Sequence, residues 1–232
     1  MLFVGAFGYG VWRFVVDFGA SQAGVHRLGP ALAVDSGLFG LFAAHHSLMA
    51  RTWAKRGLAR QLPASLERAI YVWVASALFI LLCAAWQPLP GLAWRATGLP
   101  ALVGLGLQAL GALMLCGAAR SLDVRSLVGI GAPPGAPRRE PGPRTPAEDR
   151  RATEVWCRGP YRRVRHPIYL GTLLLMGAMP TMTADRLALT LLVAAYAVLA
   201  IPWEERTLVE RHGEAYAAYR RRVRWRLLPG VY

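Results

Sequence analysis

Six runs of mainly apolar residues divide the chain, and polar, basic segments separate most of them. The runs cover residues 2–20, 31–50, 68–86, 99–119, 168–180 and 186–203. A helix crosses the hydrocarbon core of a bilayer with about 20 mainly apolar residues. The pattern therefore predicts an all-α, polytopic membrane helical bundle of about six spans, in which the last two short runs form a tight helical hairpin followed by a cytoplasmic tail.

The basic residues follow the apolar runs in a regular way. The net charge is +14, although 55% of the 232 residues are hydrophobic. Five Lys and Arg residues lie in 51–68, eleven in 120–167 and seven in 204–232, whereas the loops between these segments hold one each. Because strongly basic loops stay in the cytoplasm, we expect a multi-pass membrane protein with both termini in the cytoplasm.

This placement of charge also excludes some classes of function. A soluble nucleic-acid-binding protein gathers its basic residues on one face or along a helix, whereas here their positions depend on the apolar runs. We therefore expect membrane lipids, and no nucleic acid, as partners. The three cysteines are too few and too scattered for a disulfide framework or a zinc site, so no metal site is predicted.

Composition divides the chain into three parts. Residues 1–120 are expected to form a four-span bundle in the membrane. Residues 121–153 are expected to form a cytoplasmic linker, because much of this segment consists of Pro, Gly and Arg. Residues 154–232 contain the predicted hairpin and tail, together with the residues that carry the candidate chemistry.

Ionisable residues inside the apolar runs are costly at membrane depth, so they usually face a cavity or one another. Arg13 and Asp17 are four residues apart, so they share a helix face and can pair. His45 and His46 are adjacent and point about 100° apart on a helix, which does not suit one metal ion. They can line a substrate cavity near the cytoplasmic end of the second span. Asp35 is expected to be a polar packing or surface residue.

The segment Arg165-His166-Pro167 begins the fifth apolar run. Proline lacks an N–H and disfavours helical geometry in the residue before it, so His166 should be held extended at the start of a helix. The free N–H groups of the first helical turn favour a carboxylate or a phosphate. A belt of Arg, Tyr and Trp residues at the membrane interface would explain Arg165 and Tyr169 equally well.

Two adjacent acids, Glu204 and Glu205, follow the last apolar run of a strongly basic chain. They can neutralise neighbouring arginines as a surface pair. Alternatively, one of them binds a cationic or hydroxyl-bearing part of a ligand, such as an ammonium group or a ribose. Together with His166, the acids predict a site for an anionic or zwitterionic cofactor.

These residues also carry a resemblance to a known family. The chain contains Gly-Pro-Tyr-x-x-Val-Arg-His-Pro-x-Tyr-x-Gly from Gly159, then a hairpin, Glu-Glu, Tyr-x-x-Tyr and Leu-Leu-Pro, all within 154–229. This order is similar to the isoprenylcysteine carboxyl methyltransferase and phospholipid methyltransferase superfamily of integral membrane enzymes. Pro180 to Thr183 and the run from His46 to Arg51 resemble the bacterial methanethiol S-methyltransferases within it. Leu122 to Arg125 and the Pro-rich insert depart from that subfamily.

The resemblance implies S-adenosylmethionine as the cofactor. It implies that one group of residues binds this cofactor: Gly159, Tyr161, His166, Tyr169, Leu170, Glu204 and Glu205. Arg165 is expected to meet the methionine carboxylate or to orient the acceptor, and Tyr219 and Arg226 to cover the pocket from the cytosol. A thiol acceptor must lose its proton, because the thiolate is the nucleophile, and His166 or His46 is the candidate base.

The resemblance therefore implies a methyltransferase that acts on a small or lipophilic thiol, with methanethiol, which would give dimethyl sulfide, as the favoured acceptor. Methylation of another lipophilic carboxylate, thiol or amine uses the same scaffold. A sterol-reductase-like enzyme that uses NADPH shares part of the motif, but Pro167 and Thr172 argue against it. A non-catalytic membrane accessory protein is the alternative outside enzymology.

Overall fold

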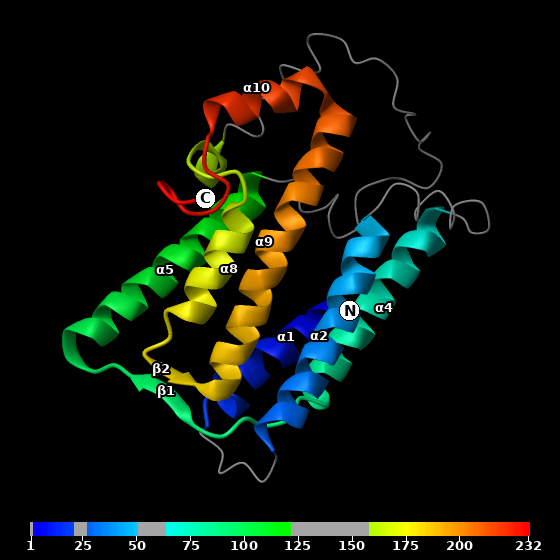
Figure 1. Ribbon diagram of the computed structural model, residues 1–232. Coiled ribbons are helices and arrows are strands. Elements are labelled where there is room, and N and C mark those ends of the chain that lie inside the picture. The colour runs from blue at the N-terminus through cyan, green and yellow to red at the C-terminus, as the bar shows by residue number, and fades with distance from the viewer. Residues whose placement is uncertain (1, 21–26, 51–63, 122–157) are drawn as a thin grey trace. The chain divides into compact units, whose positions relative to one another are not determined.

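The computed structural model describes residues 2–20, 27–50, 64–121 and 158–232 (Figure 1). These residues are mainly helical, as predicted for an all-α membrane protein. They belong to two compact units, Met1–Thr97 with Pro180–Tyr196, and Gly98–Met179 with Ala197–Tyr232. Most of the predicted linker 121–153 lies outside the described residues, so the predicted division into three parts stays a prediction.

In the first unit, helix α1 (Leu2–Trp12) continues into a π-helical turn (Arg13–Asp17). Helix α4 (Ala64–Ala84) packs against both α1 and α2 (Leu28–Ala50), and Figure 1 shows α2 and α4 side by side. The predicted pair is confirmed, since Arg13 Nη1 donates to Asp17 Oδ2 over 2.6 Å.

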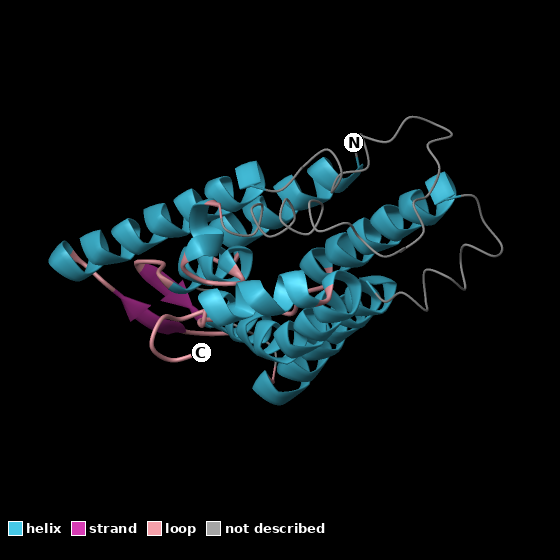
Figure 2. Cartoon of the chain, turned by 90° about the horizontal axis from the view of Figure 1, so that it is seen from above, coloured by secondary structure: helices cyan, strands magenta, loops and turns pink. Residues whose placement is uncertain are grey.

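A two-stranded sheet completes this unit (Figure 2). Strand β1 (Leu92–Arg95) runs antiparallel to β2 (Thr181–Thr183), which leads directly into helix α9 (Ala184–His212). Asp185 in the first turn of α9 accepts hydrogen bonds of 2.8 Å from the Trp86 indole and from the Leu89 backbone N–H. The start of α9 is thereby fixed to the segment that precedes β1.

The second unit is built around helix α5 (Gly98–Ser121) and helix α8 (Pro167–Gly177), which lie side by side (Figure 1). It also contains the 3₁₀ turn Gly159–Arg162, the second half of α9 and helix α10 (Glu214–Arg222). Glycines allow close contact of α5 and α8: a Cβ added to Gly111 would lie 2.6 Å from the Gly171 carbonyl oxygen. Small residues permit such close packing of membrane helices.

Replacing Gly111 by Val should separate α5 from α8 and lower the thermal unfolding midpoint of the protein in detergent. The added side chain would meet backbone atoms of α8, which cannot move aside as a flexible side chain can. Gly106→Val is the matched control on the same helix, because nothing lies within 4 Å of a Cβ at Gly106. Equal midpoints for the two variants would contradict this packing.

Among the described residues, three helical segments are long and apolar enough to cross a membrane: Leu28–Met49, Gly98–Ser121 and Ala184–Glu210. The apolar segments Ala69–Ala84 and Pro167–Gly177 are shorter. The membrane type of the fold is confirmed, while the count of six spans stays a prediction. The expected short last helix is wrong, because α9 has 29 residues and continues through Pro202.

Candidate active site

The site begins where Pro167 opens helix α8. His166 is the N-cap residue of this helix, with φ −122° and ψ 62°, and Pro167 occupies the first turn. His166 therefore lies outside helical geometry at the start of α8, as predicted, but its ψ of 62° is not the extended conformation that was predicted. The His166 side chain is only 8% exposed, so its ring is held inside the second unit rather than in solvent.

The two acids of α9 lie on either side of the His166 ring. His166 Nδ1 is 3.6 Å from Glu204 Oε2, and His166 Nε2 is 3.5 Å from Glu205 Oε1. Both distances exceed an ordinary hydrogen bond, and the buried Nε2 atom has no hydrogen-bond partner among the described residues. The structure thus brings the helix mouth and the acid pair together across about 40 residues of sequence.

Glu205 is the buried member of the acid pair. Its carboxylate receives Arg165 Nε at 2.5 Å and Arg226 Nε at 3.2 Å, and its side chain is 3% exposed. Arg165 Nη1 also donates to the carbonyl oxygens of Val223 and Arg224, each over 2.7 Å. Glu205 and Arg165 therefore bind each other and the tail, which is the segment from residue 223 to residue 232. A buried charge is tolerated only with such pairing.

Glu204 is placed differently, although it is the adjacent residue. Its side chain is 42% exposed. Its carboxylate accepts a hydrogen bond of 2.6 Å from the Tyr169 hydroxyl, one turn into α8. Tyr169 thus orients Glu204 while leaving part of its carboxylate exposed, so Glu204 is the more accessible of the two acids.

The tail closes this arrangement through backbone hydrogen bonds. The N–H groups of Arg165 and His166 donate to the carbonyl oxygens of Trp225 and Arg226, each over 2.9 Å. The N–H groups of Arg226, Leu227 and Leu228 in turn donate to the Tyr232 carbonyl oxygen. The backbone on which His166 sits is therefore held by residues about 60 positions later.

Two further tyrosines support the loop before His166. Tyr219 of α10 is 1% exposed, and its hydroxyl donates to the Tyr161 carbonyl oxygen over 2.9 Å. Burial, together with the negative charge of Glu204, raises the pKa of Tyr161 to about 12. The Tyr161 hydroxyl therefore stays protonated at neutral pH and can act as a hydrogen-bond donor.

Two other residues predicted to bind the cofactor line a cavity of about 770 Å³ in the second unit. Gly159 has φ +53°, a left-handed conformation that favours glycine, and Leu170 also packs in the core with Val164 and Ile201. His166, Tyr169, Glu204 and Glu205 are not part of the cavity wall. The predicted cofactor residues thus fall into a polar group around His166 and an apolar group at the cavity.

His46 belongs to the first unit. Its Nδ1 atom is 3.0 Å from the Tyr71 hydroxyl, and its ring packs against Phe42 and Tyr196. The neighbouring His45 stacks on Tyr71, with ring centroids 5.9 Å apart. The two histidines therefore lie in an aromatic cluster, and the role of His46 as a base stays a prediction.

Sequence reasoning missed several parts of this arrangement. It did not find the carbonyl groups of Val223 and Arg224 that bind Arg165, nor the role of Tyr232 in folding the tail back. Backbone acceptors leave no pattern in a sequence. The Leu-Leu-Pro segment before Tyr232 was the one available signal that the tail ends in packed rather than solvated residues.

Comparisons with known proteins show the family of the chain. No protein-family model matches the chain. The chain is similar to methanethiol S-methyltransferase 2 of Bradyrhizobium diazoefficiens, with 35% identity over 226 residues, 95% of this chain and 82% of the relative. It is 34% identical over 235 residues to methanethiol S-methyltransferase of Mycobacterium tuberculosis, covering 96% of this chain and 90% of that protein. Nurim of Xenopus laevis is 29% identical over 71% of this chain and 58% of its own length.

Proposed function

The chain belongs to the isoprenylcysteine carboxyl methyltransferase-like family, in which several of its relatives are named methanethiol S-methyltransferases, and we propose that it transfers a methyl group from S-adenosylmethionine to a small thiol in the bacterial inner membrane. The observation that carries this proposal is the meeting of His166, Tyr169 and Glu204 at the start of α8. The basic loop and the oriented, partly exposed Glu204 carboxylate suit a zwitterionic cofactor. The buried imidazole of His166 suits a reaction that releases a proton.

The residues around His166 fit S-adenosylmethionine in their chemistry. The half-exposed Glu204 carboxylate suits the ammonium group or the ribose hydroxyls, with Tyr169 holding it in place. The protonated Tyr161 hydroxyl offers a donor in the same unit. Gly159 and Leu170 would support the apolar side of the adenosyl group. When bound, the cofactor supplies a methyl group on a positively charged sulfur.

We assign Arg165 and Glu205 a positioning role rather than direct contact with the cofactor. Their charges are satisfied by each other, by Arg226 and by carbonyl oxygens of the tail. They therefore fix the backbone of His166 and the end of α9 relative to each other. Rigid support of this kind matters, because a methyl transfer depends on holding donor and acceptor in line.

His166 is the proposed base for the thiol. The Glu205 carboxylate lies 3.5 Å from Nε2, and the tautomer with its proton on that atom would leave the lone pair on Nδ1. In this role Nδ1 would accept the thiol proton, so that the thiolate could take the methyl group that bound S-adenosylmethionine would supply, with S-adenosylhomocysteine as the leaving group. Glu204, 3.6 Å from Nδ1 and partly exposed, can then pass the proton to solvent.

Methanethiol is the proposed acceptor, because the relatives are named for it. Dimethyl sulfide would be the product. The alternative acceptors, a lipophilic carboxylate, thiol or amine, are separated by offering the purified protein methanethiol, a longer alkane thiol and a prenylated cysteine in parallel. Transfer to the prenylated cysteine alone would move the assignment to the isoprenylcysteine type.

Replacing Glu204 by Gln should weaken binding of S-adenosylmethionine by roughly 10- to 100-fold, which is the cost of losing a charge-assisted hydrogen bond. Calorimetric titration of the purified protein in detergent measures this directly. Glu210→Gln is the matched control, because Glu210 is an exposed acid on the same helix. Unchanged cofactor affinity in the Glu204 variant would remove the proposed role of this acid.

A further inference from the structure

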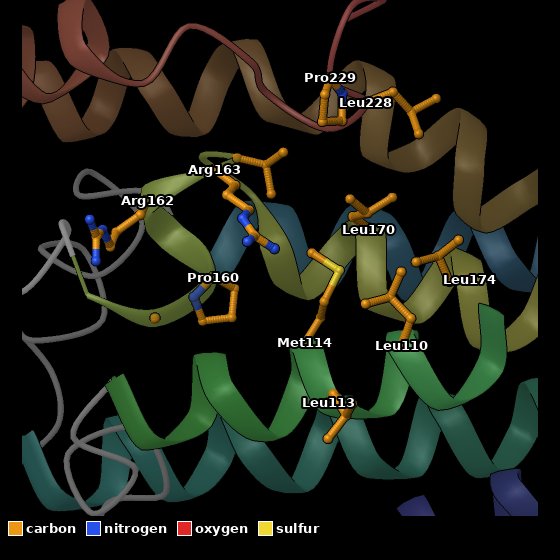
Figure 3. Close-up of a pocket in the computed structure, with 12 residues that line it drawn as sticks. Leu110, Leu113, Met114, Pro160, Arg162, Arg163, Leu170, Leu174, Leu228 and Pro229 are labelled. Atoms are coloured by element: carbon orange, nitrogen blue, oxygen red, sulfur yellow. The ribbon is translucent and has the colours of Figure 1, made fainter. Parts of the chain in front are cut away.

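The second unit contains a groove that shares only Gly159 and Leu170 with the residues proposed to bind the cofactor. It has a volume of about 770 Å³ and lies between α5, the Gly159–Arg162 turn, α8 and the tail (Figure 3). This volume lies within the usual range of small-molecule sites, about 300–1,000 Å³. No atom of the His166, Glu204 and Glu205 cluster lines it.

The wall of the groove is apolar along most of its length. Helix α5 contributes Leu110, Leu113 and Met114, helix α8 contributes Leu170 and Leu174, and Leu228 and Pro229 of the tail form the remaining side (Figure 3). Leu110 and Leu113 are 45% and 70% exposed. Because both lie in a helix long enough to span the membrane, the open side of the groove faces hydrocarbon.

Two arginines at one end are the charged members of the lining. Arg162 and Arg163 are exposed, and neither forms an ion pair with a described acid. In Figure 3 the Arg163 guanidinium points toward the groove, above Met114. This differs from Arg165, Arg226 and Arg221, which pair with glutamates. The groove therefore joins hydrocarbon walls to positive charge that no acid in the described part of the chain neutralises.

The arginines also lie at the correct depth for a headgroup. A Cβ on Gly117, near the end of α5, would lie 2.9 Å from the Pro160 ring, so the Gly159–Arg162 turn rests on the last turns of the spanning helix. The end of a spanning helix is at the level of the lipid phosphates. A cofactor with a positively charged sulfur and an ammonium group is a poor match for this end of the groove.

We propose that the groove binds one anionic phospholipid, with its phosphate at the Arg163 guanidinium and an acyl chain along Leu110, Met114 and Leu174, while Arg162 adds positive charge at the same end. Basic pockets beside membrane helices on the cytoplasmic side commonly hold anionic headgroups, and the cytoplasmic placement of this end rests on the distribution of Lys and Arg along the chain. The bound lipid would hold the tail against α5 and α8, since Leu228 and Pro229 form part of the same wall.

Native mass spectrometry of the purified full chain tests this proposal. The protein in mild detergent is mixed with dioleoylphosphatidylglycerol or with dioleoylphosphatidylcholine, and the lipid retained per chain is counted. We expect one phosphatidylglycerol per chain and roughly tenfold weaker retention of phosphatidylcholine, because the two differ in headgroup charge. Equal retention of the two lipids would overturn the proposal.

Variants locate the lipid. Arg162→Gln with Arg163→Gln should reduce phosphatidylglycerol retention by roughly tenfold, whereas Arg222→Gln with Arg224→Gln, an equal change of charge at exposed positions outside the groove, should not. Met114→Trp, which fills the groove without changing charge, should reduce retention as well. Millimolar inorganic phosphate should not displace the lipid; displacement would mean that the arginines bind phosphate without the apolar wall. Unchanged retention in both groove variants would also overturn the proposal.

Discussion

Replacing His166 by Gln should lower the turnover of thiol methylation by roughly 10²- to 10⁴-fold, the usual contribution of a general base. Binding of S-adenosylmethionine should change far less, because Glu204 and Tyr169 remain in place. Rapid-quench measurement of a single turnover, with cofactor bound beforehand, separates these two effects. The loss should shrink at high pH, where more of the thiol is already ionised.

His46 and His212 make this experiment decisive. His46→Gln tests the other candidate base, which lies in the aromatic cluster of the first unit. His212→Gln at the end of α9 is the control for loss of an imidazole. If His46→Gln abolishes turnover while His166→Gln leaves it intact, the base has been assigned to the wrong histidine.

Replacing Glu205 by Gln should destabilise the second unit by about 3–5 kcal/mol, because it leaves the buried Arg165 guanidinium without its carboxylate. Arg226 loses the same partner, so the tail should detach from the start of α8. Limited proteolysis followed by mass spectrometry would detect earlier cleavage between Val223 and Tyr232. The unfolding midpoint in denaturant measures the loss of stability.

Glu214→Gln is the matched control for this variant. Glu214 also pairs with an arginine, Arg221, but their side chains are 78% and 65% exposed. Surface pairs of this kind contribute little, so the control should unfold and be cleaved like the wild type. Equal behaviour of the two variants would mean that the Glu205 ion pairs do not hold the tail.

Much of the fold was predictable because apolar runs and proline act locally. The run 99–119 became α5, and Pro167 began α8 with His166 as its N-cap. The end of α9 was not predictable in the same way. The helix continues through Pro202 to His212, although the apolar run stops at residue 203, because a charged segment can extend a helix once the preceding turns are formed.

The different environments of Glu204 and Glu205 also could not be predicted from the sequence. A sequence pattern does not distinguish two adjacent glutamates, yet the Glu204 side chain is 42% exposed and the Glu205 side chain is 3% exposed. The difference comes from Arg165, 40 positions earlier, and Arg226, 21 positions later. Such contacts depend on the tertiary fold, which the local periodicity of apolar residues does not predict.

The account rests on methyl transfer to a thiol by the cluster around His166, and a labelling experiment tests it most directly. Purified protein in detergent is given S-adenosylmethionine with a deuterated methyl group, together with methanethiol, and the headspace is analysed by mass spectrometry. The account predicts dimethyl sulfide with one labelled methyl group, formed in equal amount to S-adenosylhomocysteine and reduced roughly 10²-fold or more by His166→Gln. Wild-type protein that binds the cofactor but releases no labelled dimethyl sulfide, or a His166 variant that releases it at the wild-type rate, would contradict the account.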